Sequence, residues 1–295
     1  MAGVEPPAEL IGDGAIMTDT VAALDDGVPG SFAFCGSKSP HSAPELVAEA
    51  RASVIVLGIR LPAEDGRCFI LATDPVRCFV TILRRLVDTG QNANQIHPTA
   101  TIGQDVRLGK NVGIGAYTVV SDDVSIGDDT VIGSGAFIDS GTIIGARCIV
   151  GAHTSIGASG QGSARDGRTA PLHFPHLGRV IIGDEVEFGA QCVIGRGILK
   201  DTIVEDWTKV GNLVNIGHNC HLEKNSWVAA RAVLCGSVRL KPNAIIGAGA
   251  SINNHTVVGA NAAVGLGSVV TKNVPPGTRV FGVPAKPIGT MRRFA

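Results

Sequence analysis

The chain has 295 residues, enough for one large domain or two smaller ones, and a formal net charge of −1. A near-neutral chain offers no basic field to a nucleic-acid backbone or to an anionic membrane surface, so we expect neither as a partner. Its longest apolar stretches, such as residues 53–59, fall short of the roughly 20 residues that a membrane span needs. The first residues lack the basic, then apolar layout of a signal peptide, so we expect a soluble cytoplasmic protein.

Residues 1–95 have a different pattern from the rest of the chain. Residues 53–58 and 69–72 have the composition of buried strands, whereas residues 43–51 and 75–87 show helical periodicity. Strands that alternate with helices predict a small α/β domain.

Residues 96–272 carry a six-residue repeat. An aliphatic residue recurs at every sixth position from Ile102 to Ile156, usually followed by glycine, and a second run extends from Ile182 to Val270. This period fits neither an α-helix nor a single strand, but it fits one short strand and one corner per hexad, with three hexads in each triangular coil. The sequence therefore predicts a mainly β fold, a parallel β-helix whose aliphatic residues fill its interior.

The repeat is interrupted twice. Residues 158–178 have no period and are rich in Gly, Pro, Arg and His, and loops of this length are usually functional. Residues 196–201 contain a four-residue shift of phase. We expect both interruptions to shape a cleft, and residues 273–295 to form a C-terminal tail.

Several segments together are more specific than the hexads. They are residues 30–34 (GSFAF), 73–75 (TDP), 96–100 (IHPTA), 177–187 (LGRVIIGDEVE), 211–219 (GNLVNIGHN) and 252–255 (INNH). In these segments the chain resembles the UDP-3-O-acylglucosamine N-acyltransferases of lipid A biosynthesis, within the hexapeptide-repeat acyltransferases. The resemblance implies a left-handed β-helix and a homotrimer with active sites between its chains. It also implies transfer of an acyl group from acyl-CoA or acyl carrier protein (acyl-ACP) to the amine of a nucleotide-linked amino sugar, without a tightly bound cofactor.

The chemistry of acyl transfer needs a base for the attacking amine and hydrogen-bond donors for the oxyanion that develops on the thioester carbonyl. Histidine suits the first task because its neutral form is abundant near neutral pH. By the resemblance, His218 is the base, His255 supports it, the Gly236 N–H is an oxyanion donor and Asn212 contacts the substrate. His255 lies two coils and one residue beyond His218 in the sequence.

Further candidate residues lie outside this group. Phe34 would stack on the nucleotide base, and His173 and His176 in the long interruption either contact substrate or only belong to a turn. Residues 270–278 and 282–288 resemble the tail of coenzyme-A-dependent hexapeptide acetyltransferases. There, Lys272 and Lys286 would lie near the phosphates of the coenzyme, unless they are ordinary surface lysines.

Some features differ from the family pattern, and other functions stay open. The resemblance implies that the small domain binds a nucleotide sugar through Phe34, but residues 35–41 contain no tyrosine to complete a base-stacking pair. The short tail favours coenzyme A over a carrier protein as donor. The alternatives are an acetyl-CoA-dependent N-acetyltransferase of a dTDP-, UDP- or GDP-linked amino-deoxysugar, an O-acetyltransferase, a zinc hydratase and a non-catalytic trimeric scaffold. We expect no metal site at His218, Cys220 and His221, because neighbours on a strand point to opposite faces.

Overall fold

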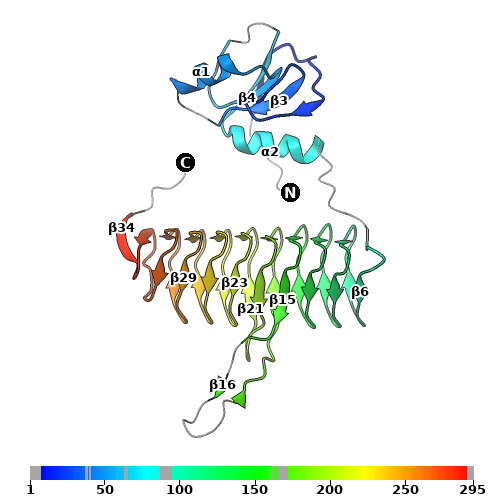
Figure 1. The fold of residues 1–295 in the computed structure, drawn as a ribbon, viewed down its shortest axis with the longest axis vertical. Helices are drawn as coiled ribbons and strands as arrows, with labels where there is room; N and C mark the ends of the chain where they lie inside the picture. The colour runs from blue at the N-terminus through cyan, green and yellow to red at the C-terminus, as the bar shows by residue number, and fades with distance from the viewer. Residues whose placement is uncertain are drawn as a thin grey trace. The chain divides into compact units, whose positions relative to one another are not determined.

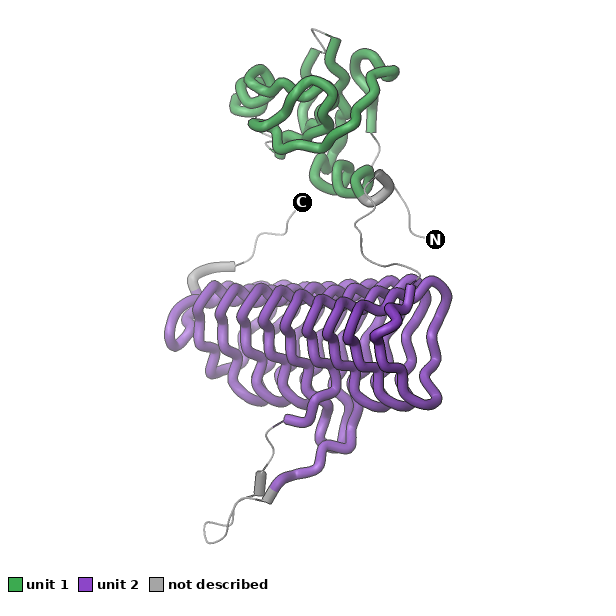
Figure 2. Tube along the Cα trace, turned by 45° about the vertical axis from the view of Figure 1, so that its right-hand side comes forward, with its two compact units in different colours: residues 1–89 green, residues 90–295 purple. Residues whose placement is uncertain are grey.

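The computed structural model describes residues 8–36, 39, 41–62, 66–86, 95–160, 163–164 and 172–290. The chain forms two compact units, Met1–Thr89 and Gly90–Ala295, shown in green and purple in Figure 2. Each unit has hydrophobic clusters of its own.

The first unit is a five-stranded sheet between two helices. Its strands are β1 (Ala8–Gly12), β2 (Thr20–Val21), β3 (Ser31–Phe34), β4 (Val54–Leu57) and β5 (Cys68–Ala72), in the order β1-β5-β4-β3-β2, and its helices are α1 (Ser42–Glu49) and α2 (Pro75–Leu86). Only β1 runs antiparallel to its neighbour. The small α/β fold is as predicted, although β1, β2 and β3 were not predicted as strands.

The two helices pack on opposite faces of this sheet because strand residues alternate. Ala43 and Val47 of α1 pack in one cluster with Ile55, whereas Phe79 of α2 packs in the other with Val56. Helix α2 begins at the Thr-Asp-Pro segment: the Arg77 N–H donates to the Asp74 carboxylate at 3.0 Å, as expected of an N-cap followed by proline.

The second unit is a parallel β-helix with three faces (Figure 1). The first face contains β7 (Arg107–Leu108), β10 (Ser125–Ile126), β13 (Ile143–Ile144), β18 (Val180–Ile182), β21 (Thr202–Val204), β24 (His221–Leu222), β27 (Arg239–Leu240) and β30 (Val257–Val258). The second contains β8 (Gly113–Ile114), β11 (Val131–Ile132), β14 (Ile149–Val150), β19 (Glu187–Phe188), β22 (Lys209–Val210), β25 (Trp227–Val228), β28 (Ile245–Ile246), β31 (Ala263–Val264), β33 (Thr278–Phe281) and β34 (Lys286–Thr290). The third contains β6 (Thr101–Ile102), β9 (Val119–Val120), β12 (Phe137–Ile138), β15 (Ser155–Ala158), β20 (Val193–Gly195), β23 (Asn215–Ile216), β26 (Val233–Leu234), β29 (Ser251–Ile252) and β32 (Val269–Val270).

The interior and the corners of the β-helix explain the repeat. The aliphatic residue of each hexad points inward. Along the first face, Ile144 pairs with Ile182, Ile182 with Val204 and Val204 with Leu222, and all four are almost fully buried. Corner residues such as Asn243 (φ 61°) adopt the left-handed conformation that asparagine tolerates. Aspartate or asparagine side chains at the corners also accept backbone N–H groups of the preceding coil, as Asp122 does from Gln104 at 2.7 Å. Hexad spacing and corner chemistry therefore both specify this fold.

The predicted long interruption leaves the β-helix between β15 and β18. The described part includes a short antiparallel pair, β16 (Ser163–Ala164) with β17 (Leu172–His173), which projects from the coils in Figure 1. Residues 161–162 and 165–171 of the predicted loop lie outside the described residues. The predicted shift of phase lies between β20 and β21, at the base of the same excursion. Over the described ranges, neither helix is long and apolar enough to cross a membrane.

Candidate active site

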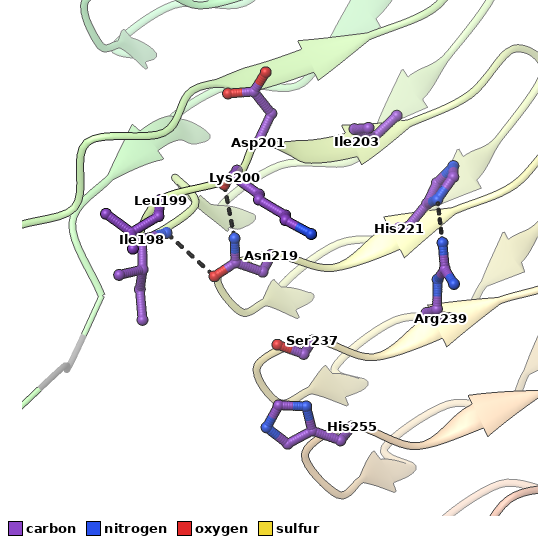
Figure 3. A pocket seen from close by; sticks show the side chains of 10 residues that line it. All are labelled: Ile198, Leu199, Lys200, Asp201, Ile203, Asn219, His221, Ser237, Arg239 and His255. Carbon is purple, nitrogen blue, oxygen red and sulfur yellow. Dashed lines mark hydrogen bonds between the residues drawn. The ribbon is translucent and has the colours of Figure 1, made fainter.

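His218 lies at the corner that follows β23, and its neighbour Asn219 fixes its orientation. The Asn219 Nδ2 donates to the Lys200 carbonyl at 2.7 Å, and its Oδ1 accepts the Ile198 N–H at 3.1 Å, which defines which side of the amide carries oxygen (Figure 3). The same Oδ1 lies 3.0 Å from His218 Nδ1. Because an amide oxygen only accepts, His218 Nδ1 carries the hydrogen and Nε2 keeps a lone pair. Asn219 was not predicted from the sequence to have this role.

Gly236 lies against the His218 ring in the next coil. A Cβ atom at residue 236 would lie 2.5 Å from both Nε2 and Cε1 of His218. Other coils have Asp122 or Asn212 at this place in the hexad, where the side chain reaches the coil before it. Glycine therefore leaves the space that the imidazole occupies. In the described part of the chain no acceptor is bonded to the Gly236 N–H, so this group can serve as a donor.

His255 follows one coil further along the same edge. Its N–H donates to the Gly236 carbonyl at 3.0 Å, and its side chain is exposed. His255, Ser237 and Asn219 line an open cleft of about 720 Å³, which Figure 3 shows from close by. His218, Gly236 and His255 are thus brought to one edge of the β-helix.

The first face contributes charged groups to this cleft. The His221 Nε2 lies 2.7 Å from a carboxylate oxygen of Glu205, and Arg239 lies 3.5 Å from the other ring nitrogen of His221. Lys200 and Asp201 line the cleft as well. The cleft therefore offers polar contacts of both signs beside the histidine corner.

The excursion brings a second histidine to His218. His176 is only 6% exposed, and its ring centroid lies 5.7 Å from that of His218, edge to face. His173, which is exposed, stacks on His176 with the ring centroids 6.2 Å apart. Of the two histidines left open between substrate contact and turn, His176 therefore lies beside His218, and His173 contacts His176.

Arg196, which the sequence analysis did not single out, holds the base of the excursion. Its Nε donates to the Gly178 carbonyl at 2.9 Å, and its two terminal nitrogens reach the Ser140 carbonyl at 3.1 Å and the Asp139 carboxylate at 3.3 Å. Arg196 thereby ties the segment that follows His176 to the preceding coil. Only the phase shift around residues 196–201 was a signal of its importance.

Asn212 lies away from this corner, and Phe34 belongs to the first unit. Asn212 is at the opposite end of β23, and its Oδ1 accepts the Ala190 N–H at 2.8 Å. Phe34 is half-buried in the first unit with its ring centroid 4.7 Å from that of Phe79. Their predicted contacts with the substrate and the nucleotide base remain predictions.

The two tail lysines line one cavity. Lys272 and Lys286 are both exposed and border a cavity of about 320 Å³ together with Asn273 and Pro284. The antiparallel pairing of β33 with β34 brings Lys286 back toward Lys272, although they are 14 positions apart in the sequence. Their interaction with coenzyme phosphates remains a prediction.

Cys220, between His218 and His221, points into the interior. It is fully buried, its thiol donates to the Cys235 carbonyl at 3.2 Å, and burial raises the pKa of the Cys220 thiol to about 12. A thiolate, which both metal binding and nucleophilic attack need, is therefore disfavoured at Cys220. Among the described residues no three His, Cys, Asp or Glu side chains gather as a metal site would require.

The repeat and the fold match known proteins. Residues 123–158 match the family described as bacterial transferase hexapeptide (six repeats), and residues 99–116 match the hexapeptide repeat of succinyl-transferase. UDP-N-acetylglucosamine acyltransferase from Campylobacter jejuni superposes with a TM-score of 0.61 at 27% identity, over 66% of this chain and 75% of that one. The corresponding O-acyltransferase from Moraxella catarrhalis gives 0.60 at 26% identity, over 66% and 74%. These similarities confirm the predicted left-handed parallel β-helix.

The sequence relatives are UDP-3-O-acylglucosamine N-acyltransferases. The protein of Methylobacterium sp. strain 4-46 is 38% identical over 40% of this chain, and the chain spans only 33% of that relative. The protein of Cupriavidus metallidurans is 39% identical over 80% of this chain and 71% of its own length. Because this second alignment extends over most of both proteins, the chain belongs to the UDP-3-O-acylglucosamine N-acyltransferase family.

Proposed function

We propose that this protein is an N-acyltransferase, in which His218 is the general base that activates the amine of a nucleotide-linked amino sugar. The observation that carries this proposal is the contact of His218 with Gly236, in which Nε2 keeps its lone pair while Asn219 holds Nδ1. The names of the relatives support UDP-3-O-acylglucosamine as the acceptor. We further propose lipid A biosynthesis in the cytoplasm as the setting, as the resemblance to this family implies.

The proposed reaction forms one C–N bond and breaks one C–S bond. The amine attacks the thioester carbonyl carbon, His218 Nε2 takes a proton from the amine nitrogen, and negative charge develops on the carbonyl oxygen. The Gly236 N–H is placed to donate to that oxygen. The tetrahedral intermediate then collapses, the thiolate leaves, and the His218 imidazolium returns the proton to it. The products are an amide and a free thiol, and no acyl-cysteine is needed.

His255 and Asn212 complete the proposed machinery. His255 lies beyond Gly236 on the same edge and borders the cleft, where it can bind a polar group of either substrate. Asn212 lies at the other end of β23 from His218. In the proposed homotrimer, with its sites between chains, Asn212 contacts the substrate from a neighbouring subunit.

The identity of the acyl donor is less constrained than that of the acceptor. We propose that Lys272 and Lys286 bind the phosphates of coenzyme A, because both border the same exposed cavity. This favours acyl-CoA over acyl carrier protein and supports a second candidate, an acetyl-CoA-dependent N-acetyltransferase of an amino-deoxysugar. Phe34 packs on Phe79, and this packing does not indicate which nucleotide base the protein binds.

The test is product mass spectrometry with a panel of nucleotide amino sugars, with acetyl-CoA and hydroxyacyl carrier protein as alternative donors. We expect an N-acylated product from the wild type and none from His218→Ala. His153→Ala is the matched control. The His153 ring lies against Gly135 of a neighbouring coil, as the His218 ring lies against Gly236, but the two histidines belong to different coils. If no combination of donor and acceptor gives a product, the result favours the alternative function, a non-catalytic trimeric scaffold.

A further inference from the structure

His176 has one ring nitrogen without a protein partner. Its Nδ1 lies 2.9 Å from the Phe174 carbonyl oxygen, which can only accept, so Nδ1 carries the hydrogen and Nε2 of the neutral ring carries a lone pair. The side chain is only 6% exposed, and within the described residues Nε2 makes no hydrogen bond. Buried polar atoms are rarely left unpaired, so this nitrogen is expected to meet a hydrogen of a ligand.

The same arrangement occurs in His218, so the two imidazoles form a pair of acceptors. In each ring a protein oxygen holds the Nδ1 hydrogen and Nε2 keeps its lone pair. A Cβ atom at Gly160 would lie 3.3 Å from His176 Nε2 and 3.8 Å from His218 Cδ2. One point above the Gly160 backbone is thus in contact with both rings.

We propose that His176 Nε2 accepts a hydrogen bond from the second N–H of the attacking amine and thereby makes the site select amines over hydroxyls. This inference rests on the proposed N-acyl transfer. A neutral primary amine has two hydrogens: His218 removes one, and His176 binds the other. With both hydrogens engaged, the nitrogen lone pair is directed away from the two rings and toward the thioester carbon.

A hydroxyl cannot satisfy both histidines. It has one hydrogen, so after bonding to His218 it presents only lone pairs to His176 Nε2, and a buried acceptor stays unpaired. A site built around a hydrogen bond discriminates strongly against an analogue that lacks it. No proton moves to His176 in this scheme. The second hydrogen stays on nitrogen and remains in the amide product, where it can still bond to His176.

The test compares two acceptors that differ at one atom: UDP-3-O-acylglucosamine and UDP-3-O-acylglucose, in which a hydroxyl replaces the amine. We expect His176→Leu to lower kcat/KM for the amine about tenfold or more, the effect of losing one hydrogen bond to a buried acceptor, and to leave the hydroxyl rate nearly unchanged. His176→Gln, which supplies an amide oxygen as acceptor, should keep most of the preference. His153→Leu, which changes an exposed histidine outside the excursion, is the matched control, and thermal unfolding shows whether each variant is folded.

The outcomes separate this inference from the function on which it rests. A wild type that acylates the amine, together with a His176→Leu variant whose amine-to-hydroxyl ratio is unchanged, overturns the role of His176 and leaves the proposed function standing. If His176→Leu lowers kcat/KM equally for the amine and the hydroxyl acceptor, His176 has a structural role only, and the inference is overturned as well. A wild type that acylates neither acceptor overturns both proposals.

Discussion

At the scale of single residues, the candidate site depends on which polar atoms the protein has already bonded. Asn219 bonds both its amide oxygen and its amide nitrogen within the protein, and the oxygen holds His218 Nδ1 so that Nε2 lies on the side of Gly236. A base needs this arrangement, because the wrong tautomer presents a hydrogen instead of a lone pair to the substrate.

The first prediction concerns Asn219. Asn219→Ala removes the acceptor that holds His218 Nδ1, and we expect kcat to fall by about 10- to 100-fold with little change in KM, as for other residues that orient a functional histidine. The measurement is steady-state kinetics of thiol release. Asn243→Ala is the control: Asn243 has the same left-handed corner conformation, but its side chain bonds to the corner residues Asn225 and Asn261. A kcat equal to that of the control would contradict the role of Asn219.

The candidate residues differ in how far the sequence predicted their roles. The motif around residues 211–219 indicated His218, and glycine at 236 is explained once the imidazole is seen against it. The role of His176 was left open between substrate contact and turn, because no periodic pattern predicts where an excursion returns. Asn219 was missed because its importance lies in bonds to Ile198 and Lys200, on a turn of irregular phase.

At the scale of elements, the hexad repeat predicted the β-helix strands because one inward residue per hexad specifies both the strand and its register. The short pair β16–β17 and the final hairpin β33–β34 were not predicted, since neither follows the repeat and both depend on antiparallel pairing. The same holds for β1, whose register with β5 cannot be read from its own residues.

The second prediction compares two neighbouring isoleucines of β28. Ile246 is fully buried in the interior, whereas Ile245 points outward and is half-buried. We expect Ile246→Ala to lower the free energy of unfolding by about 2 to 5 kcal/mol through the cavity that it leaves. Ile245→Ala, the same chemical change, should have a clearly smaller effect in urea denaturation followed by circular dichroism. Equal losses would contradict the assigned register.

The third prediction concerns the element that carries His176. Arg196→Met removes the three interactions that tie the excursion to Gly178, Ser140 and Asp139. We expect faster proteolysis of the excursion and about tenfold lower activity, because His176 and the His218 corner lose their fixed spacing. Arg147→Met, which removes exposed ion pairs with Asp184 and Glu185, is the control and should behave as wild type. Unchanged proteolysis of the Arg196 variant would count against this account.

At the scale of the whole molecule, the third face of the β-helix suggests assembly. Its outward residues include Val119, Phe137, Val193 and Val233, all between 37% and 39% exposed. A single chain therefore presents several apolar side chains to water on this face, interrupted by Ser155 and Asn215. Exposed apolar groups gathered on one face usually mark protein contacts, so this face supports the proposed homotrimer.

The fourth prediction is the mass of the particle. We expect light scattering to give about 91 kDa, three times the 30.3 kDa of one chain. Phe137→Asp should lower the mass toward that of one chain, because a charge in an apolar contact stays unpaired. Trp227→Asp, on the second face, changes an exposed aromatic residue in the same way and should leave the trimer intact. A wild-type mass near 30 kDa would contradict the trimer.

The most direct test of the central claim is the rate of thiol release from the acyl donor, measured with and without the amino-sugar acceptor. If His218 is the base, release depends on the amine and falls about 100-fold or more in His218→Ala, the usual contribution of a general base. His153→Ala should match the wild type in the same assay. Amine-dependent release that persists at the wild-type rate in His218→Ala would contradict the mechanism proposed for this protein.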